Sequence, residues 1–251
     1  MLQLPKKQRV HIVLWKWEQP SARVGSSYTA HYVNVMAAML RRNNTLDARI
    51  ICITDRADGI TECETAPLWR DLDTIANATK DHLPSCYRRL KLYDYKTQRS
   101  LGIDKGDRIL SIDLDSVICG NLNSVLQTEG RYVGWGLKGS HHLNVFNGSF
   151  QMFTSGDLQE IWSSFDPNTS PRECFRKGWL GSDQSWLSMN LIDQPGSVAL
   201  RWPEVASYPL QVKLMGHHSA KTRIMFFHGQ IKPWSPEALK ASPFLNRYWR
   251  L

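Results

Sequence analysis

Three short apolar segments, separated by stretches with helical spacing, constrain the fold of this chain more than any other feature. Val10–Trp17, Asp47–Thr54 and Arg108–Asp113 are predicted strands, and the second is continuous in its apolar character, as a buried parallel strand is. Helices are predicted between them, from a cap at Ser26–Ser27 through Arg42 and from Tyr87 to about Ser100. This alternation predicts an α/β fold with a mainly parallel sheet.

The second half of the sequence is less regular but continues the pattern. Strands are predicted at Tyr132–Leu137, Val145–Phe153 and Arg223–Phe227, and helices at Asp157–Phe165 and from a cap at Ser182–Asp183 to about Leu191. No internal repeat, low-complexity linker or domain boundary is visible in the sequence. We therefore expect residues 1–251 to form a single domain around one central sheet.

Cysteine usage and apolar runs indicate the compartment. The five cysteines are odd in number, scattered, and form no Cys-x-x-Cys pair, which argues against a disulfide framework and a structural zinc site. The N-terminus lacks the apolar core of a signal peptide. The longest apolar stretch, Val33–Leu40, is too short to span a bilayer. We expect a soluble, cytoplasmic protein.

The charge is positive and unevenly distributed. The formal net charge is +8, and residues 201–251 carry eight Lys or Arg against two Glu. Such a surplus favours an anionic partner, which could be a phosphate-bearing ligand, a membrane surface or a nucleic acid. The alternative is a surface whose Lys and Arg side chains serve only solubility.

The predicted strand Arg108–Asp113 leads into two carboxylates, Asp113 and Asp115, with one residue between them. On an extended chain these side chains point the same way, and hard divalent cations take carboxylate oxygens as ligands. In open α/β sheets ligands bind at the carboxyl ends of the strands, where this pair is expected. The alternative is a half-exposed strand on which Ser111, Asp113 and Asp115 face water.

A second polar segment, Phe226–Trp234, begins where the last predicted strand ends. His228 can be a metal ligand or a proton carrier, Gly229 lets the backbone approach a ligand, and Lys232 can bind phosphate as a point charge. The alternative is a strand and turn with a core histidine and a surface lysine. A cation on the acidic pair and a lysine opposite it would form a clamp that stabilises a leaving diphosphate.

Four short motifs occur in the order and approximate spacing of a known family: Asp113–Asp115, Phe146–Gly148, Gly181–Gln184 and His228–Trp234. On these motifs, over roughly residues 10–235, the sequence resembles the retaining GT-A glycosyltransferases (family 8-like) related to glycogenin and the bacterial lipopolysaccharide galactosyltransferases. The resemblance implies a Rossmann-like GT-A domain. Its nucleotide-binding half would cover about 10–120, its donor-sugar and acceptor half about 121–235, and a basic aromatic tail 236–251.

The resemblance also implies a role for each matched residue. Asp113 and Asp115, with His228 as a third ligand, would hold Mn²⁺ (or Mg²⁺) on the diphosphate of a nucleotide sugar. Asp183 and Gln184 would lie beside the sugar and its reacting carbon as the catalytic pair. Contacts with the donor would come from five further positions: Arg89, Leu114, Asn147, Gly229 and Lys232.

Two motifs depart from the family pattern. The metal-ligating His of the family usually lies three residues before the Gly, where this sequence has Phe226. His228 is the immediate neighbour of Gly229 and would share a strand face with position 226, so it could supply the ligand from a shifted place. The usual Asn-Ser-Gly order is Asn147-Gly148-Ser149 here, which predicts a different loop beneath the sugar.

The function predicted from the sequence is therefore that of a metal-dependent glycosyltransferase with a nucleotide-sugar donor. The family resemblance implies that the donor is a UDP-sugar and that the transferred sugar keeps the configuration of its anomeric carbon. The alternatives are a metal-dependent nucleotidyltransferase, a non-catalytic nucleotide-sugar binder, and a nucleic-acid-binding protein. No nucleic-acid motif is recognisable, so no nucleic-acid partner is expected. The basic C-terminal fifth favours an anionic acceptor, be it a glycan, a lipid-linked sugar or a protein. The tail 243–251 could also touch a membrane surface.

Overall fold

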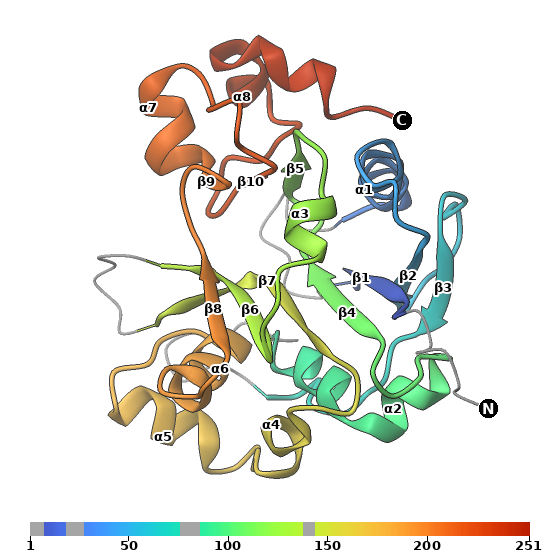
Figure 1. The fold of residues 1–251 in the computed structure, drawn as a ribbon, viewed down its shortest axis with the longest axis vertical. Helices are drawn as coiled ribbons and strands as arrows, with labels where there is room; N and C mark the ends of the chain where they lie inside the picture. The colour runs from blue at the N-terminus through green and yellow to red at the C-terminus, as the bar shows by residue number, and fades with distance from the viewer. Residues whose placement is uncertain (1–7, 19–27, 76–85, 138–143) are drawn as a thin grey trace, which may run out of the picture.

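A seven-stranded mixed sheet forms the centre of the computed structural model, which describes residues 8–18, 28–75, 86–137 and 144–251 (Figure 1). Its strand order is β3-β2-β1-β4-β7-β6-β8, and every neighbouring pair is parallel except those that involve β7. The mainly parallel α/β sheet predicted from the sequence is thus confirmed. The strands are β1 (Val10–Lys16), β2 (Ala48–Thr54), β3 (Glu64–Pro67), β4 (Arg108–Ile112), β6 (Tyr132–Gly136), β7 (Phe146–Thr154) and β8 (Ser197–Leu200).

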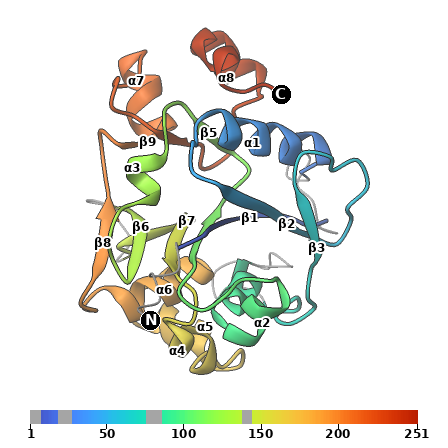
Figure 2. The ribbon, with the colours of Figure 1, turned by 45° about the vertical axis from the view of Figure 1, so that its right-hand side comes forward.

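Helices cover both faces of this sheet (Figures 1 and 2). One face carries α1 (Ala30–Arg42) and α3 (Asn123–Leu126). The other face carries the 3₁₀ helix η1 and the helices α2, α4, α5 and α6. These elements are η1 (Cys86–Tyr93), α2 (Tyr95–Ser100), α4 (Gln159–Ser163), α5 (Ser170–Arg176) and α6 (Asp183–Leu191).

A second, three-stranded sheet joins the end of the chain to the acidic pair. Its order is β5-β10-β9, with β5 (Ser116–Ile118), β10 (Ile224–Phe226) and β9 (Val205–Ser207). Because β5 begins one residue after Asp115 and pairs with β10, the sheet brings the C-terminal motif next to that carboxylate. Four short helical elements complete this end of the molecule: η2 (Tyr208–Val212, a π-helix), α7 (Lys213–Met215), α8 (Pro236–Ala241) and η3 (Pro243–Arg247).

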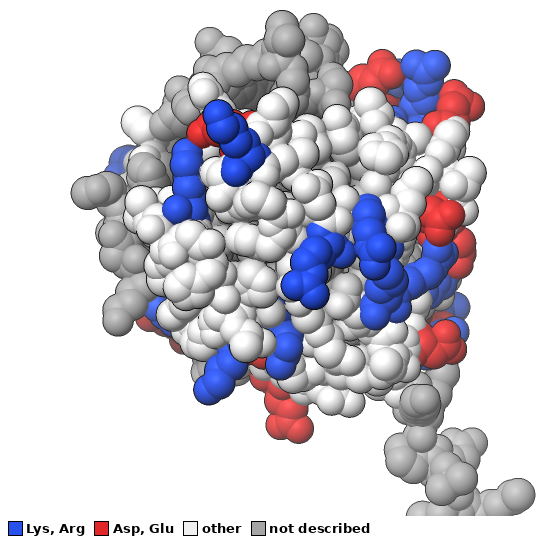
Figure 3. Space-filling model, turned by 90° about the horizontal axis from the view of Figure 1, so that it is seen from above, with Lys and Arg blue, Asp and Glu red and all other residues white. Residues whose placement is uncertain are grey.

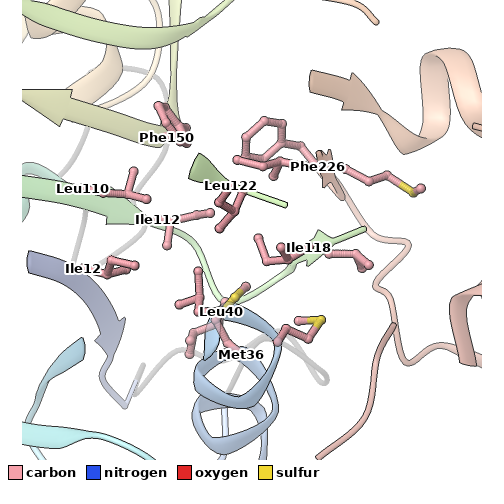
Figure 4. Packing of buried hydrophobic residues seen from close by; sticks show 14 of the residues in the cluster. Ile12, Met36, Leu40, Leu110, Ile112, Ile118, Leu122, Phe150 and Phe226 are labelled. Atoms are coloured by element: carbon pink, nitrogen blue, oxygen red, sulfur yellow. The ribbon is translucent and has the colours of Figure 1, made fainter. Parts of the chain in front are cut away.

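Strand alternation divides the core into two apolar layers. In β1, Ile12 and Leu14 join the layer beneath α1, whereas Val13 and Trp15 join the layer on the opposite face. Figure 4 shows the first layer, in which Ile112 of β4 lies near Leu40 of α1. The sheet is therefore buried on both faces at its centre, as parallel strands require. No helix in the described ranges is long and apolar enough to cross a membrane.

Some helices and strands begin or end at other residues than the sequence predicted. The single helix expected over Tyr87–Ser100 is wrong, because Asp94 adopts an extended conformation and its carboxylate accepts the N–H groups of Lys96 and Thr97, which starts a new helix. Strand β4 ends at Ile112, so the acidic pair lies in the turn that follows. Helix α1 begins at Ala30, and the cap expected at Ser26–Ser27 lies outside the described residues.

Candidate functional site

The acidic pair lies at the carboxyl end of β4, on the strand edge where ligands bind in open α/β sheets. The half-exposed strand offered as an alternative is wrong, because β4 is buried throughout and Ser111 accepts a hydrogen bond from Trp15 Nε1 at 2.8 Å. The Asp113 side chain is 29% exposed, whereas that of Asp115 is only 10% exposed. One carboxylate of the pair therefore faces solvent and the other faces the protein.

Lys232 meets the buried member of the pair. Its Nζ lies 2.5 Å from Asp115 Oδ2, and the Tyr28 hydroxyl donates to the same oxygen at 3.1 Å. Burial raises the pKa of Asp115 above its ordinary value, Lys232 opposes this change, and Asp113 adds to it. Two sequence motifs 117 residues apart thus form one cluster. The proximity of the carboxylate pair and the lysine, which the clamp requires, is present in the structure.

Arg89 connects the acidic pair with Asp183. One Nη group contacts Asp113 Oδ1, and Nη2 lies 2.8 Å from Asp183 Oδ2. Burial alone lowers the pKa of Arg89, but Asp183, with Asp113, raises it well above the ordinary value. The guanidinium is therefore a fixed positive charge between two carboxylates. The structure brings Arg89, Asp113 and Asp183 together, whereas the roles that the resemblance implies for them stay predictions.

Asp183 begins helix α6 and is held from two sides. Its Oδ2 accepts from Arg89 and, at 2.8 Å, from Gln151 Nε2 on β7. Gln151 Nε2 also donates to Gly148 O at 3.0 Å, and its Oε1 accepts from the Tyr93 hydroxyl at 3.1 Å. Burial raises the pKa of Asp183, and Arg89 opposes that rise. The sequence analysis missed Gln151, although a glutamine between Phe150 and Met152 in an apolar strand is a visible signal.

The glycine at position 148 is required by the charge cluster. A Cβ built there would lie 2.9 Å from Arg89 Nη2 and 3.1 Å from Asp183 Oδ1, so a larger residue would separate the ion pair from β7. This close approach explains the Asn147-Gly148-Ser149 order. Gly148 N donates to Gln184 Oε1 at 3.4 Å, and Asn147 Oδ1 accepts from Ser149 N at 2.8 Å. Asn147 and Gln184 therefore flank the same short stretch of β7.

Two donor-binding residues implied by the resemblance have different surroundings. Leu114 is 2% exposed and packs in the core, so only its backbone is placed to contact a ligand. Gly229 is exposed and has a φ of +87°, in the left-handed region that favours glycine. Apart from its two chain neighbours, no atom of the described residues lies within 4 Å of a Cβ built at Gly229. Its backbone is therefore open to a ligand.

Strand β10 ends at Phe226, so His228 lies beyond the strand rather than on one of its faces, although the rings of both residues contact Trp135. Its Nε2 forms a hydrogen bond with Ser207 Oγ at 2.8 Å, and burial, followed by the charge of Lys232, lowers its pKa. In the part of the chain that the structure describes, no three His, Cys, Asp or Glu side chains gather as a metal-binding group. The role of His228 as third ligand stays a prediction.

The donor set nevertheless fits a divalent cation at the acidic pair. Each carboxylate is already neutralised by a cationic side chain, Arg89 on Asp113 and Lys232 on Asp115. The pair is thus a place where positive charge gathers in this structure, and its oxygens are the hard ligands that Mn²⁺ and Mg²⁺ accept. Asp113 and Asp115 are the residues that would hold the ion.

Aromatic side chains connect this cluster with the end of the chain. The Trp234 ring stacks on Tyr32 with centroids 4.0 Å apart and lies 5.8 Å from Tyr28, the residue that donates to Asp115. Trp249 lies 5.2 Å from Trp234 and 6.4 Å from Tyr32. The aromatic part of the tail 236–251 thus packs on its own domain beside the candidate site.

Comparisons with known proteins identify the class of fold. Neither protein-family models nor curated protein sequences match the chain. Among solved structures, a crystal structure of the galactosyltransferase LgtC with donor and acceptor sugar analogues matches with a TM-score of 0.63 and 13% identity, covering 96% of this chain and 97% of that chain. An active-site mutant of LgtC matches with the same values.

A third match is the glycosyltransferase GlyE of Streptococcus pneumoniae, with a TM-score of 0.51 and 12% identity, covering 92% of this chain and 57% of that chain. The fold is therefore that of the GT-A glycosyltransferases, which confirms the fold class that the four motifs implied. Within this class the chain matches LgtC over almost the full length of both proteins.

Proposed function

We propose that this protein is a metal-dependent glycosyltransferase that transfers a sugar with retention from a nucleotide sugar, specifically a UDP-sugar, to an anionic acceptor. The observation that carries the proposal is the contact between Asp115 and Lys232 at 2.5 Å, in a chain with the fold of LgtC. It unites an acid-x-acid pair with a lysine at the carboxyl edge of the sheet. A diphosphate leaving group needs positive charge, which the lysine and a cation held by the acidic pair would supply.

The charges of the cluster suit the departure of a diphosphate. Lys232 is partly exposed and can exchange Asp115 for a phosphate oxygen, whereas Arg89 is buried and stays between its two carboxylates. Asp113 and Asp115 would hold a divalent ion, which when bound would supply Lewis-acid stabilisation of the leaving group. We propose that His228 completes this ligand set, since burial and Lys232 favour its neutral, ligating form.

Asp183 and Gln184 are proposed to orient the sugar. The Asp183 carboxylate is immobilised through Oδ2 by Arg89 and Gln151, so it acts as a fixed acceptor for a sugar hydroxyl. Gln184 lies beside Gly148 and Asn147, which would contact the same sugar. The proposed path is same-face attack by the acceptor on the anomeric carbon, with the bond to the diphosphate breaking as the new glycosidic bond forms.

Thermal stabilisation by UDP and Mn²⁺ tests the proposal. At ligand concentrations about 100 times Kd, binding adds roughly 2.7 kcal/mol of stability, which corresponds to a rise in Tm of about 5–10 °C for a domain of this size. We expect this rise only when UDP and Mn²⁺ are present together, and we expect it to shrink in Lys232→Ala but to persist in Lys221→Ala, which removes an exposed lysine.

A folded sample that UDP and Mn²⁺ together stabilise no more than either does alone would contradict the proposal. Where the pair does stabilise the protein, a screen of nucleotide sugars for metal-dependent hydrolysis identifies the donor. Turnover of nucleoside triphosphates without cleavage of any nucleotide sugar would favour the nucleotidyltransferase instead.

A further inference from the structure

Exposed apolar side chains concentrate in one short stretch of the chain. Of the seven large apolar residues that are strongly exposed in the described ranges, three lie within six residues: Leu210 at 66%, Leu214 at 78% and Met215 at 41%. We call these three side chains the α7 surface. Leu210 and Leu214 are four residues apart across η2 and α7, which places them on one side of the helical turns.

This apolar cluster lies in the most cationic part of the sequence. Residues 208–251 carry seven Lys or Arg and a single Glu. That Glu, Glu237, pairs with Lys213 at 2.7 Å, while Lys221, Lys240 and Arg247 are exposed. Figure 3 looks onto this end of the molecule and shows Lys and Arg side chains over a largely uncharged surface, with most Asp and Glu toward the rim.

The aromatic residues of the C-terminal tail do not provide the exposed apolar groups. Trp249 packs on Trp234, and the Tyr248 hydroxyl forms a hydrogen bond with His218 Nε2 at 3.3 Å. Arg42 donates to the carbonyl oxygens of Tyr248 and Arg250, which holds the tail against α1. Apart from Leu251 at the end of the chain, the strongly exposed large apolar side chains of the segment 208–251 are therefore those of the α7 surface.

We propose that the α7 surface, together with the surrounding lysines and arginines, binds the interface of a bilayer that contains anionic lipids. Leu210, Leu214 and Met215 would enter the headgroup boundary, and Lys221, Lys240 and Arg247 would lie over the lipid phosphates. The proposal concerns where the protein resides and does not depend on the proposed transferase activity.

The shape and size of this surface favour a membrane over a protein partner. In Figures 1 and 2, α7 lies at an outer corner of the molecule beside α8 rather than within a recess. A stable protein interface uses about 20–30 residues on each side, whereas the α7 surface offers three apolar side chains. A few inserted apolar groups within a cationic field are sufficient for reversible interfacial binding. The binding should therefore be weak and sensitive to salt.

Co-sedimentation with lipid vesicles tests the proposal. We expect the full chain to bind vesicles of phosphatidylglycerol and phosphatidylcholine at low salt, to bind pure phosphatidylcholine at least ~10-fold more weakly, and to dissociate from the anionic vesicles as salt rises. The double variant Leu210→Ser/Leu214→Ser should lose ~10-fold or more of the binding to anionic vesicles. These side chains are 66% and 78% exposed, so their replacement leaves the core intact.

Phe175→Ser is the matched control. Phe175 is 50% exposed but lies on α5, at the opposite end of the molecule in Figure 1, so this variant should bind vesicles as the unmodified chain does. Lys221→Gln/Lys240→Gln should weaken binding to anionic vesicles and leave the residual binding to neutral vesicles unchanged. UDP- and Mn²⁺-dependent stabilisation is measured on the same samples and should not change in any variant.

Three results would overturn the proposal. The unmodified chain could fail to bind anionic vesicles at low salt, or Leu210→Ser/Leu214→Ser could bind as well as Phe175→Ser. The third is a dimer on size-exclusion chromatography that the double leucine variant abolishes, which would make the α7 surface a contact between two copies of the chain. Failure of UDP and Mn²⁺ to stabilise the protein would contradict the proposed function and leave this inference standing.

Discussion

Arg89 balances two carboxylates that come from different parts of the fold. Asp113 follows β4 and is partly exposed, whereas Asp183 begins α6 and is 2% exposed. Removal of the cation therefore affects the two acids differently. Water can solvate Asp113, but Asp183 would keep an unpaired charge in the interior.

Arg89→Met should destabilise the protein by about 3–5 kcal/mol, because it leaves Asp183 buried without its partner. The measurement is urea unfolding at neutral pH. Arg89→Met/Asp183→Asn should recover most of this loss, since the buried charge disappears with the second substitution. Lys91→Met is the control on the same helix: its partner Asp71 is 44% exposed, so the change should stay below about 1 kcal/mol. Equal losses in the double and single Arg89 variants would contradict this explanation.

His11 is a titrating group at the opposite end of the sheet from the site. It is 1% exposed on β1, and its Nε2 lies 3.0 Å from Asp107 Oδ2. Burial lowers the pKa of His11 even though Asp107 opposes this change, and the pKa of Asp107 is also lowered, by His11 among other groups. Both groups therefore bind protons more readily in the unfolded chain than in the folded one.

Stability should consequently fall as the pH decreases. For a depressed pKa the contribution is present above the unfolded-state value and disappears as the pH falls through the folded-state value. Between pH 7.5 and pH 5 we expect His11→Gln to lose less stability than the unmodified chain, by on the order of 1 kcal/mol. Urea unfolding at both pH values measures this difference. Parallel pH profiles for the two proteins would show that His11 does not contribute.

At the scale of elements, the strands that have a local sequence pattern could be predicted, whereas those that depend on long-range pairing could not. Strands β1, β2 and β4 were predictable because a strand buried on both faces is a continuous apolar run. Strands β5 and β9 have only three residues each and gain their identity from pairing with β10, so no local pattern marks them. The break at Asp94 was hidden because η1 and α2 together have helical spacing.

In the candidate site, too, the residues with a local sequence signal could be predicted and those defined by long-range contacts could not. Asp113, Asp115, His228 and Lys232 stand out because charged or metal-binding residues follow predicted strands. Their partners do not stand out: Arg89 reaches Asp183 across 94 positions of the chain, and Gln151 reaches it across 32. Such contacts depend on how β7 and α6 pack beside η1. The family resemblance supplied Arg89, whereas nothing in the motifs supplied Gln151.

The C-terminal segment is an element whose packing affects the site. Trp249 supports Trp234, which supports Tyr28, which donates to Asp115. Trp249→Ala should destabilise the protein by about 1–3 kcal/mol, less than a fully buried tryptophan, because Trp249 is half-buried. It should also reduce the stabilisation by UDP and Mn²⁺, measured as the shift in Tm. Leu251→Ala, at a residue that is 64% exposed, is the control and should change neither quantity.

At the scale of the whole molecule, the two halves of the chain share their sheets and their cores. Strand β4 of the first half pairs with β7 of the second, and β5 pairs with β10. Each apolar layer draws on both halves: Val33 and Met225 belong to one, Val13 and Trp186 to the other. The two halves of the chain, about 10–120 and 121–235, are therefore not expected to fold separately.

Unfolding should accordingly be a single transition, as predicted for one domain over residues 1–251. Differential scanning calorimetry should give one peak of roughly 180 kcal/mol near 60 °C, at about 0.7 kcal/mol per residue, with equal calorimetric and van't Hoff enthalpies. Phe150→Ala removes a fully buried side chain from β7, and the loss of about 3–5 kcal/mol should shift the whole peak downward without splitting it. Two resolved peaks in either protein would mean that the halves unfold independently despite the shared sheets.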